Sequence, residues 1–211
     1  MSEDDVLEVF KHEGVILTGH FVGTSGKHLD TYVDKDRVSM NPVAIAMLAA
    51  GLACELRDEK IEVVIAPALG AIVLGQWVAY HLCAQTGVSI KFLIAEKVAD
   101  PFLPFVLRPK EEDIKGKRTL VVDDILTTGG SAAKVVKVAK AAGAEVVAVG
   151  ALCNRGGVTA LEVGDVPRFV TLLNLKLNSW DYPCPLCDSG VPVNTNVGKG
   201  KEFLAKIGLK S

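Results

Sequence analysis

One uncharged stretch limits what this chain can fold into. From Val63 to Ile90, 28 residues, the sequence contains no Asp, Glu, Lys or Arg. On length alone, a stretch of this kind is long enough to span a bilayer. However, Pro67 ends a strand-like run of four apolar residues, and Gly87 ends a helical pattern that contains two glutamines. We therefore interpret it as a strand, a tight turn containing Gly70 and a helix in the core of a soluble protein, and we expect no membrane association.

Strand-like and helix-like segments alternate along the rest of the chain. Strands are expected at 62–66, 90–95, 118–123, 145–152 and 169–173, and helices at 3–11, 42–57, 71–86, 130–142 and 200–209. This alternation predicts an α/β fold with a right-handed, doubly wound parallel sheet flanked by helices. With 211 residues, the chain is expected to form a single domain. The segment from Glu96 to Lys117 holds three prolines and is expected to be a long irregular connection, of the kind that often forms a lid.

Composition excludes several classes of protein. Hydrophobic residues make up 49% of the chain and aromatic residues 6%, which excludes disorder and fits a sheet buried on both faces. The formal net charge is -2, so no nucleic-acid partner is expected. Five cysteines are too few, and odd in number, for a secreted disulfide framework, and the N-terminus is acidic where a targeting peptide would be basic. A cytoplasmic, reducing location is expected.

The most informative segment runs from Thr119 to Ser131, with the sequence TLVVDDILTTGGS. A buried strand ends in two carboxylates, Asp123 and Asp124, and a turn of small hydroxyl and glycine residues then opens a helix. Free backbone N–H groups at such a turn favour a phosphate monoester. The carboxylates would repel that phosphate, so we expect them to face sugar hydroxyls, a Mg²⁺ shell, or both. The segment therefore predicts a sugar-phosphate site, and neither a P-loop nor a dinucleotide fingerprint is present in the sequence.

This segment resembles the phosphoribosyl pyrophosphate (PRPP) motif of type I phosphoribosyltransferases. The resemblance implies a parallel sheet flanked by helices, with a core at about 40–175 and a small hood from about 1–40 and 176–211. It also implies that Asp123 and Asp124 are catalytic, hold the ribose 2′- and 3′-hydroxyls, and approach the cofactor Mg²⁺ through water or those hydroxyls. The other residues of the motif implied to bind PRPP are Ile125, Leu126, Thr127, Thr128, Gly129, Gly130 and Ser131, the last five around the 5′-phosphate.

A second turn is similar to the pyrophosphate loop of the same family. It lies between the expected strand 62–66 and the helix that follows, and its small residues would let backbone amides reach the leaving group. The residues implied to bind PRPP here are Ala68, Leu69 and Gly70. Ala71 stands where some members of the family have a lysine.

Three further segments are similar to orotate phosphoribosyltransferases in particular. They are His20–His28 with Tyr32-Val33, then Cys153–Gly157, and finally Trp180–Gly198 with its Cys-x-x-Cys. The resemblance implies that Arg155 binds the base, and a guanidinium fork suits the carboxylate of orotate. The residues implied to contact orotate are Thr127, Arg155, Thr24 and Lys27. The family also implies a homodimer.

The expected lid departs from the family pattern. Typical members carry R-x-x-x-K-x-H-G, and only Lys97 matches, because Pro101 and Leu103 occupy the next basic positions. We predict that Lys97 is catalytic and binds PRPP, and that Arg108 also binds PRPP, with Lys110 and Lys115 as further basic candidates.

The pair Cys184 and Cys187 is a weak metal signal. A structural zinc needs four ligands, and no second C-x-x-C or H-x-x-x-H accompanies the pair. The four histidines are remote in sequence, so we interpret the pair as a turn in the hood, with a dimeric metal site or a redox pair as alternatives.

The function expected from these observations is transfer of the 5-phosphoribosyl group from PRPP to orotate, which gives orotidine 5′-phosphate and pyrophosphate. Two alternatives remain: a phosphoribosyltransferase for another base, and a PRPP- or nucleotide-sensing regulator of the same fold.

Overall fold

The structure is a computed structural model, and it describes residues 1–23, 25–100, 104–109 and 114–208. Several predicted residues therefore lie outside the described residues: Thr24, Pro101, Leu103 and Lys110.

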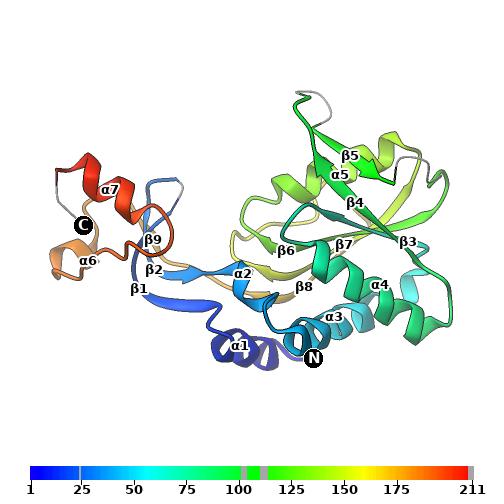
Figure 1. Ribbon diagram of the computed structural model, residues 1–211, viewed down its shortest axis with the longest axis horizontal. Coiled ribbons are helices and arrows are strands. Elements are labelled where there is room, and N and C mark those ends of the chain that lie inside the picture. Colours follow the sequence, from blue (N-terminus) through cyan, green and yellow to red (C-terminus); the bar gives the residue numbers. More distant parts are fainter. Residues whose placement is uncertain (24, 101–103, 110–113, 209–211) are drawn as a thin grey trace.

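A six-stranded sheet forms the centre of the molecule (Figure 1). Its order is β5-β4-β3-β6-β7-β8, and all neighbours pair in parallel except β5, which runs antiparallel to β4. The strands are β3 (Val63–Pro67), β4 (Lys91–Lys97), β5 (Phe105–Arg108), β6 (Arg118–Leu126), β7 (Glu145–Asn154) and β8 (Arg168–Asn174). Helices cover both faces, which confirms the predicted fold class.

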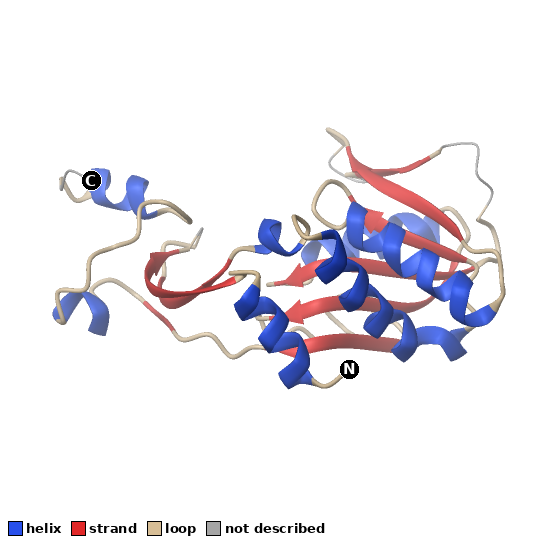
Figure 2. Cartoon of the chain, turned by 60° about the horizontal axis from the view of Figure 1, so that its bottom comes forward, coloured by secondary structure: helices blue, strands red, loops and turns tan. Residues whose placement is uncertain are grey.

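Two apolar layers sandwich this sheet. One packs against α1 (Glu3–His12), α3 (Pro42–Leu56) and α4 (Ile72–Thr86), and the other against α5 (Gly130–Ala141). On β6, Leu120 and Val122 belong to the first layer and Val121 to the second, as the alternation of a strand requires. In the turned view, helices lie both in front of the strands and behind them (Figure 2).

Local signals explain where the helices begin. The Ser2 hydroxyl accepts from the Asp5 N–H and the Asp5 carboxylate accepts from the Ser2 N–H, which forms a capping box on α1. The Asn41 side chain accepts from the N–H groups of Val43 and Ala44 and caps α3, with Pro42 as its first residue.

The uncharged stretch folds as β3, a turn and α4, as predicted. Every residue of β3 is buried, because sheet neighbours and helices enclose it on all sides. Among the described residues, none of the helices combines the length and the apolar character that crossing a bilayer requires.

The segment from Glu96 to Lys117 is less irregular than predicted. β4 continues to Lys97, and β5 pairs with it in an antiparallel register in which Lys97 faces Phe105. Phe105 is buried in the α5 layer, so this short edge strand is held by its own apolar anchor. β6 is also longer than expected: it continues past Asp123 to Leu126, because Ile125 and Leu126 pair with the end of β7.

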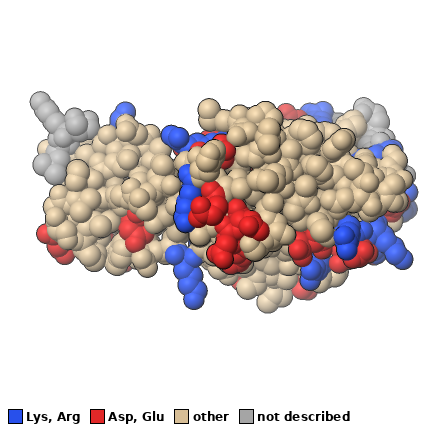
Figure 3. All heavy atoms as spheres, turned by 90° about the horizontal axis from the view of Figure 1, so that it is seen from below, with Lys and Arg blue, Asp and Glu red and all other residues tan. Residues whose placement is uncertain are grey.

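The two chain ends form a second, three-stranded sheet with the order β1-β2-β9, which we call the hood sheet. Its strands are β1 (Ile16–Val22), β2 (His28–Val33) and β9 (Ser179–Trp180). The short helices around it are α2 (Lys35–Val38), α6 (Pro185–Asp188) and α7 (Gly200–Lys206), while the 3-10 turn η1 (Arg57–Glu59) follows α3. The hood sheet extends to one side of the central sheet (Figures 1 and 2). Seen from below, acidic and basic side chains gather near the place where the two parts meet (Figure 3). Since α1 packs on the central sheet, the residues before 40 contribute to both parts, and the predicted division at about 40 and 175 stays a prediction.

Candidate functional site

Two buried carboxylates lie near the carboxyl end of the central strand β6. Asp123 and Asp124 are 7% and 5% exposed. The Asp124 N–H donates to Asp123 Oδ1 at 3.0 Å, and the Ile125 N–H donates to Asp124 Oδ1 at 2.7 Å. Asp124 Oδ2 accepts from Lys35 Nζ, at 3.3 Å, at the start of α2. These contacts fix both side chains at the edge of the sheet where ligands of open α/β folds bind.

The acidic pair is electrostatically strained. Burial and the neighbouring carboxylate of Asp124 together raise the pKa of Asp123 to about 7. Lys35 compensates only part of this negative charge, because its side chain is half exposed. A ligand that brings hydroxyl donors or a divalent cation would relieve the repulsion.

The turn after β6 forms a small cradle of about 130 Å³. Gly129, with φ +71°, changes the chain direction at the start of α5. Among the described residues, no acceptor receives the N–H groups of Thr128, Gly129 and Ser131. The structure therefore presents free donors at a helix N-terminus, as the sequence predicted for a phosphate.

The turn between β3 and α4 borders a larger cleft of about 510 Å³. The Ala68 N–H is bonded to Ala95 O at 2.8 Å, whereas the N–H groups of Leu69, Gly70 and Ala71 have no acceptor among the described residues. Two lysines from other elements, Lys35 and Lys97, also line this cleft. Free amides and two cations suit a second, highly charged anion.

Gly70 is required for this arrangement. A Cβ atom at this position would lie 2.6 Å from Asp124 Oδ2 and 2.7 Å from Lys35 Nζ. The turn can therefore approach the acidic pair only without a side chain at Gly70.

A third cleft, of about 240 Å³, lies between the phosphate turn and the hood sheet. Arg155 follows β7 and its Nε donates to Thr127 Oγ1 at 2.9 Å. Lys27 and Tyr32 line the cleft from the hood sheet. Gly156 lets the two loops touch, because a Cβ there would lie 1.6 Å from Thr127 O. The cleft thus combines cations with apolar and aromatic walls, which suits a flat, anionic molecule.

The clefts form one continuous groove. A pocket of about 230 Å³ at the acidic pair shares Thr127 and Arg155 with the third cleft. It shares Asp123 and Ser131 with both the cradle and the larger cleft. One ligand can therefore place a phosphate on the turn, hydroxyls on the acids and a second anion on the β3–α4 turn.

The sequence predicted most, but not all, of the residues in this groove. It did not find Lys35, Asp36 and Ser39, which line the larger cleft. The only available signal was the position of Lys35, shortly after a strand-like segment. Arg108 lies outside the described pockets, and its Nε pairs with Glu96 at 2.8 Å, so its contact with PRPP stays a prediction.

A model of the phosphoribosyl transferase domain matches residues 41–185, which include the acidic pair, both turns and Arg155. The fold and the groove thus define a phosphoribosyltransferase. The chain is 36% identical over 194 residues to the orotate phosphoribosyltransferase of Caldanaerobacter subterraneus subsp. tengcongensis, covering 92% of this chain and 96% of the relative. It is 38% identical over 196 residues to that of Heliobacterium modesticaldum, covering 91% and 96%. The chain belongs to the orotate phosphoribosyltransferase family.

Solved structures of orotate phosphoribosyltransferases have the same fold. The orotate phosphoribosyltransferase of Mycobacterium tuberculosis H37Rv, in complex with inorganic phosphate, matches with a TM-score of 0.66 and 26% identity over 82% of this chain and 96% of that chain. The enzyme from Aeropyrum pernix matches with a TM-score of 0.64 and 26% identity over 81% and 93%.

Proposed function

We propose that this protein transfers the 5-phosphoribosyl group from PRPP to orotate, with release of pyrophosphate. The observation that carries the proposal is the continuous groove, in which the acidic pair lies between two anion-binding turns and beside a cleft with Arg155. Membership in the orotate phosphoribosyltransferase family supports it.

Each region of the groove takes one part of the substrates. The 5′-phosphate binds the N–H groups and hydroxyls of the turn 127–131, while the ribose hydroxyls bind Asp123 and Asp124. The pyrophosphate binds the amides of Leu69 and Gly70. Lys35 and Lys97 approach the same group from α2 and β4.

Orotate occupies the cleft beside the hood sheet. The Arg155 guanidinium binds its carboxylate, and the bond from Arg155 Nε to Thr127 Oγ1 holds that side chain in place. Lys27 lies on the opposite wall and adds a second cation. Thr24 belongs to the same segment of the hood but lies outside the described residues.

The residues present fit a magnesium ion. Asp123 and Asp124 provide hard oxygen donors, and the raised pKa of Asp123 shows that their negative charge is not fully compensated. The carboxylates would hold Mg²⁺ through water or the ribose hydroxyls. When bound, this ion would neutralise charge on the pyrophosphate that leaves.

The residues of the groove favour a loose transition state. As the bond between C1′ and the pyrophosphate oxygen breaks, positive charge develops on the ribose ring. The carboxylates of Asp123 and Asp124 lie on the hydroxyl side of that ring and stabilise this charge, while Lys35 and Lys97 stabilise the departing anion. The orotate nitrogen then attacks C1′ from the other face. Since orotate arrives as an anion, the protein mainly positions the reactants.

We also propose that the protein is a homodimer. Apolar side chains are exposed at helical spacing on the neighbouring helices α3 and α4: Val43 and Met47 on α3, Val73 and Tyr80 on α4. A monomer would leave this surface in water, whereas a second copy of the chain would cover it.

The test of the function is a steady-state assay with PRPP, orotate and Mg²⁺, followed by the loss of orotate absorbance and the release of pyrophosphate. Turnover with orotate is expected. Tight PRPP binding without turnover would reject the proposal that the protein is an enzyme and would favour a PRPP sensor. Turnover only with another base would reject orotate as the substrate.

Arg155→Ala separates the roles of the clefts. Loss of a charged hydrogen-bond pair is worth about 1.5–3 kcal/mol, so the KM for orotate should rise about tenfold to a hundredfold while the KM for PRPP changes little. Arg168→Ala is the matched control, because Arg168 is exposed at the start of β8. Equal effects of Arg155→Ala on both KM values would reject the assignment.

A further inference from the structure

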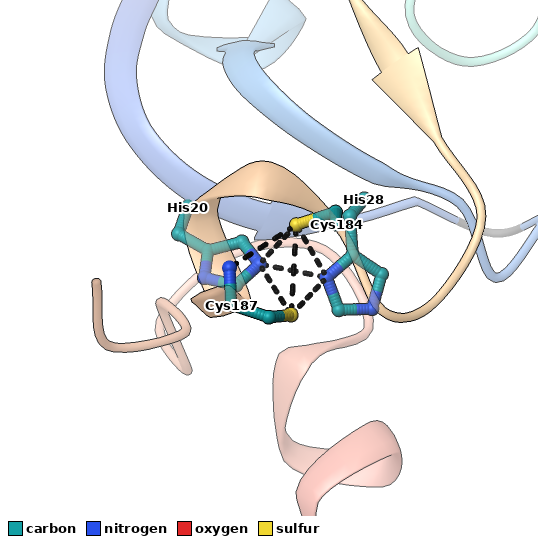
Figure 4. A group of neighbouring side chains, drawn as sticks. All are labelled: His20, His28, Cys184 and Cys187. Carbon is teal, nitrogen blue, oxygen red and sulfur yellow. Dashed lines mark hydrogen bonds between the residues drawn. The ribbon is translucent and has the colours of Figure 1, made fainter. Parts of the chain in front are cut away.

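Four potential metal ligands converge in the hood sheet, outside the groove. His20 lies on β1, His28 begins β2, Cys184 caps α6 and Cys187 lies within that helix. Figure 4 shows their side chains pointing toward one another from these elements. Their ligand atoms, one nitrogen from each ring and the two sulfurs, all lie within 4.8 Å of one another. Of the residues that the structure describes, no other group of three or more such side chains comes together in this way.

The separations between these atoms match a tetrahedron. In a tetrahedral zinc site, the bond lengths of sulfur and nitrogen ligands place the ligand atoms about 3.3–3.8 Å apart. Here the two sulfurs are 3.5 Å apart, and the four sulfur–nitrogen distances run from 3.4 to 3.8 Å. The two nitrogens, His20 Nε2 and His28 Nδ1, are 2.7 Å apart. A small rotation of either ring would open this one distance by the roughly 0.6 Å that a metal requires.

The hydrogen bond of His20 sets its ring for metal binding. His20 Nδ1 lies 2.7 Å from the backbone oxygen of Val191. A carbonyl oxygen only accepts, so Nδ1 carries the proton and donates it. In the neutral ring, Nε2 then presents a lone pair to the other three ligands. A backbone carbonyl that orients a histidine in this way is typical of the surroundings of zinc sites.

Burial of these polar side chains costs folding free energy unless an ion binds them. His20, His28 and Cys184 are all at most 2% exposed, although each carries polar atoms. Aromatic rings pack against His28: the centroid of Phe203 lies 4.7 Å away, edge-on, and that of Tyr182 lies 5.6 Å away. His28 Nε2 has no hydrogen-bond partner among the described residues.

The cysteine turn is shaped to present thiolates. Pro185 opens α6, and the Cys187 N–H points at Cys184 Sγ at 3.4 Å. A backbone N–H donor stabilises a thiolate, which is the form that binds metals. Both cysteines are free thiols. A disulfide would use the two sulfurs but would leave the two buried histidine nitrogens facing it without a role.

We propose that His20, His28, Cys184 and Cys187 form a structural zinc site. Two imidazole and two thiolate ligands in a tetrahedron select Zn²⁺ among the common divalent ions. Four protein ligands close the coordination shell, so the site holds structure rather than binding a substrate. Three of the four ligands lie outside the residues matched by the phosphoribosyl transferase domain.

The ion would connect the two ends of the chain. It would join the β1–β2 hairpin to the segment around α6, which is more than 150 residues away in sequence. The hood sheet is a small unit of three short strands, and small units of this kind commonly need such a link. The same hairpin carries Lys27 and Tyr32, so the site would also hold one wall of the third cleft.

The direct test is the metal content of the purified full-length chain. Protein produced with zinc in the medium and passed through a chelating column should retain one equivalent of zinc per chain, measured by inductively coupled plasma mass spectrometry. After exchange with Co²⁺, the visible spectrum should show the intense d–d bands of tetrahedral cobalt and a thiolate charge-transfer band. A metal-free, folded protein that fails to give these bands would overturn the proposal, as would a disulfide between Cys184 and Cys187 in freshly prepared protein.

Variants identify the ligands. Cys187→Ser, at the most accessible of the four positions, should lose the bound zinc and the cobalt charge-transfer band, and Cys184→Ser should behave in the same way. Cys54→Ser and His12→Ala are the controls, because both residues are exposed and remote from the cluster, and both variants should retain one equivalent. Retention of zinc by both Cys184→Ser and Cys187→Ser, or its loss from the controls, would reject this ligand set.

A second experiment measures how zinc removal changes the hood sheet and the kinetics. Its kinetic part rests on the proposed function. Zinc removal should increase hydrogen exchange in β1 and β2 while β6 and β7 stay protected, and should raise the KM for orotate more than the KM for PRPP. Uniform exchange across both sheets would contradict a local structural role. Because metal content and exchange do not depend on turnover, failure of the zinc site and failure of the proposed reaction give different results.

Discussion

Asp123→Asn should make the protein more stable and inactive. The carboxylate of Asp123 is buried beside that of Asp124, and both effects raise its pKa from 3.8 to about 7. In the unfolded chain the same group titrates near its ordinary value. Between these two pH values the native state binds one more proton than the unfolded state, so stability falls as pH rises through this window. Asparagine has a similar shape and no charge, and it removes this dependence.

The size of the effect follows from the two pKa values. At about 1.4 kcal/mol per pKa unit, the difference between 3.8 and about 7 corresponds to roughly 4 kcal/mol above pH 7. Near pH 5 only a minor part of this has developed, because pH 5 is closer to the ordinary pKa of the unfolded chain than to the raised pKa of the native state. Asp123→Asn should therefore have a higher free energy of unfolding than the wild type, and this difference should grow between pH 5 and pH 8. Its upper limit is roughly 4 kcal/mol, because Lys35 offsets part of the repulsion between the two carboxylates.

Urea unfolding near pH 5 and near pH 8, without Mg²⁺ or PRPP, measures this margin. Asp58→Asn is the control, since the Asp58 side chain is 94% exposed and its removal should leave stability unchanged at both pH values. PRPP binding by Asp123→Asn, measured by calorimetry, should be strongly weakened. A variant less stable than the wild type near pH 8, or a margin that is the same at both pH values, would refute the argument that this carboxylate is destabilising.

Three further predictions concern backbone approach and the exposed apolar surface. Gly156→Ala places a Cβ against the Thr127 carbonyl, so the loops must separate; the KM for orotate should rise and stability should fall by about 1–3 kcal/mol, and unchanged kinetics would contradict the contact. Gly70→Ala should disrupt the contact between Asp124 and its lysine partner and weaken PRPP binding, measured by calorimetry, with little loss of stability. Tyr80→Glu places a charge on the exposed face of α4 and should shift a dimer to a monomer in light scattering, whereas an unchanged mass would place any interface elsewhere.

The sequence predicted those parts of the site that are local in the chain. The acids, the phosphate turn and the start of α5 follow one another within 119–131, so their geometry is set by one strand and one turn. Arg155 was predicted from the similarity of Cys153–Gly157 to the family. In the structure it follows β7, the strand beside β6, and parallel neighbours place their carboxyl ends at the same edge of the sheet.

Contacts between distant segments were not predictable in the same way. Lys35 meets Asp124 across 89 residues, and its position depends on how the hood sheet lies against the central sheet. Spacing along the chain gave no indication that His20 and His28 lie beside Cys184, because both histidines are more than 150 residues away in the sequence. In space the β1–β2 pairing brings the two histidines together, and α6 then brings the cysteines to them.

The cations of the groove come from outside the uncharged stretch. β3 lies at the centre of a sheet covered on both faces, where a charged side chain would have no water. At Gly70 there is no room for any side chain, because Asp124 and Lys35 already occupy the space. Without a basic side chain of its own, the turn offers its amides, and the lysines reach the cleft from α2 and from the end of β4, where both side chains are exposed. Burial explains the absence of charge in β3, and the close approach of Asp124 and Lys35 explains it at Gly70.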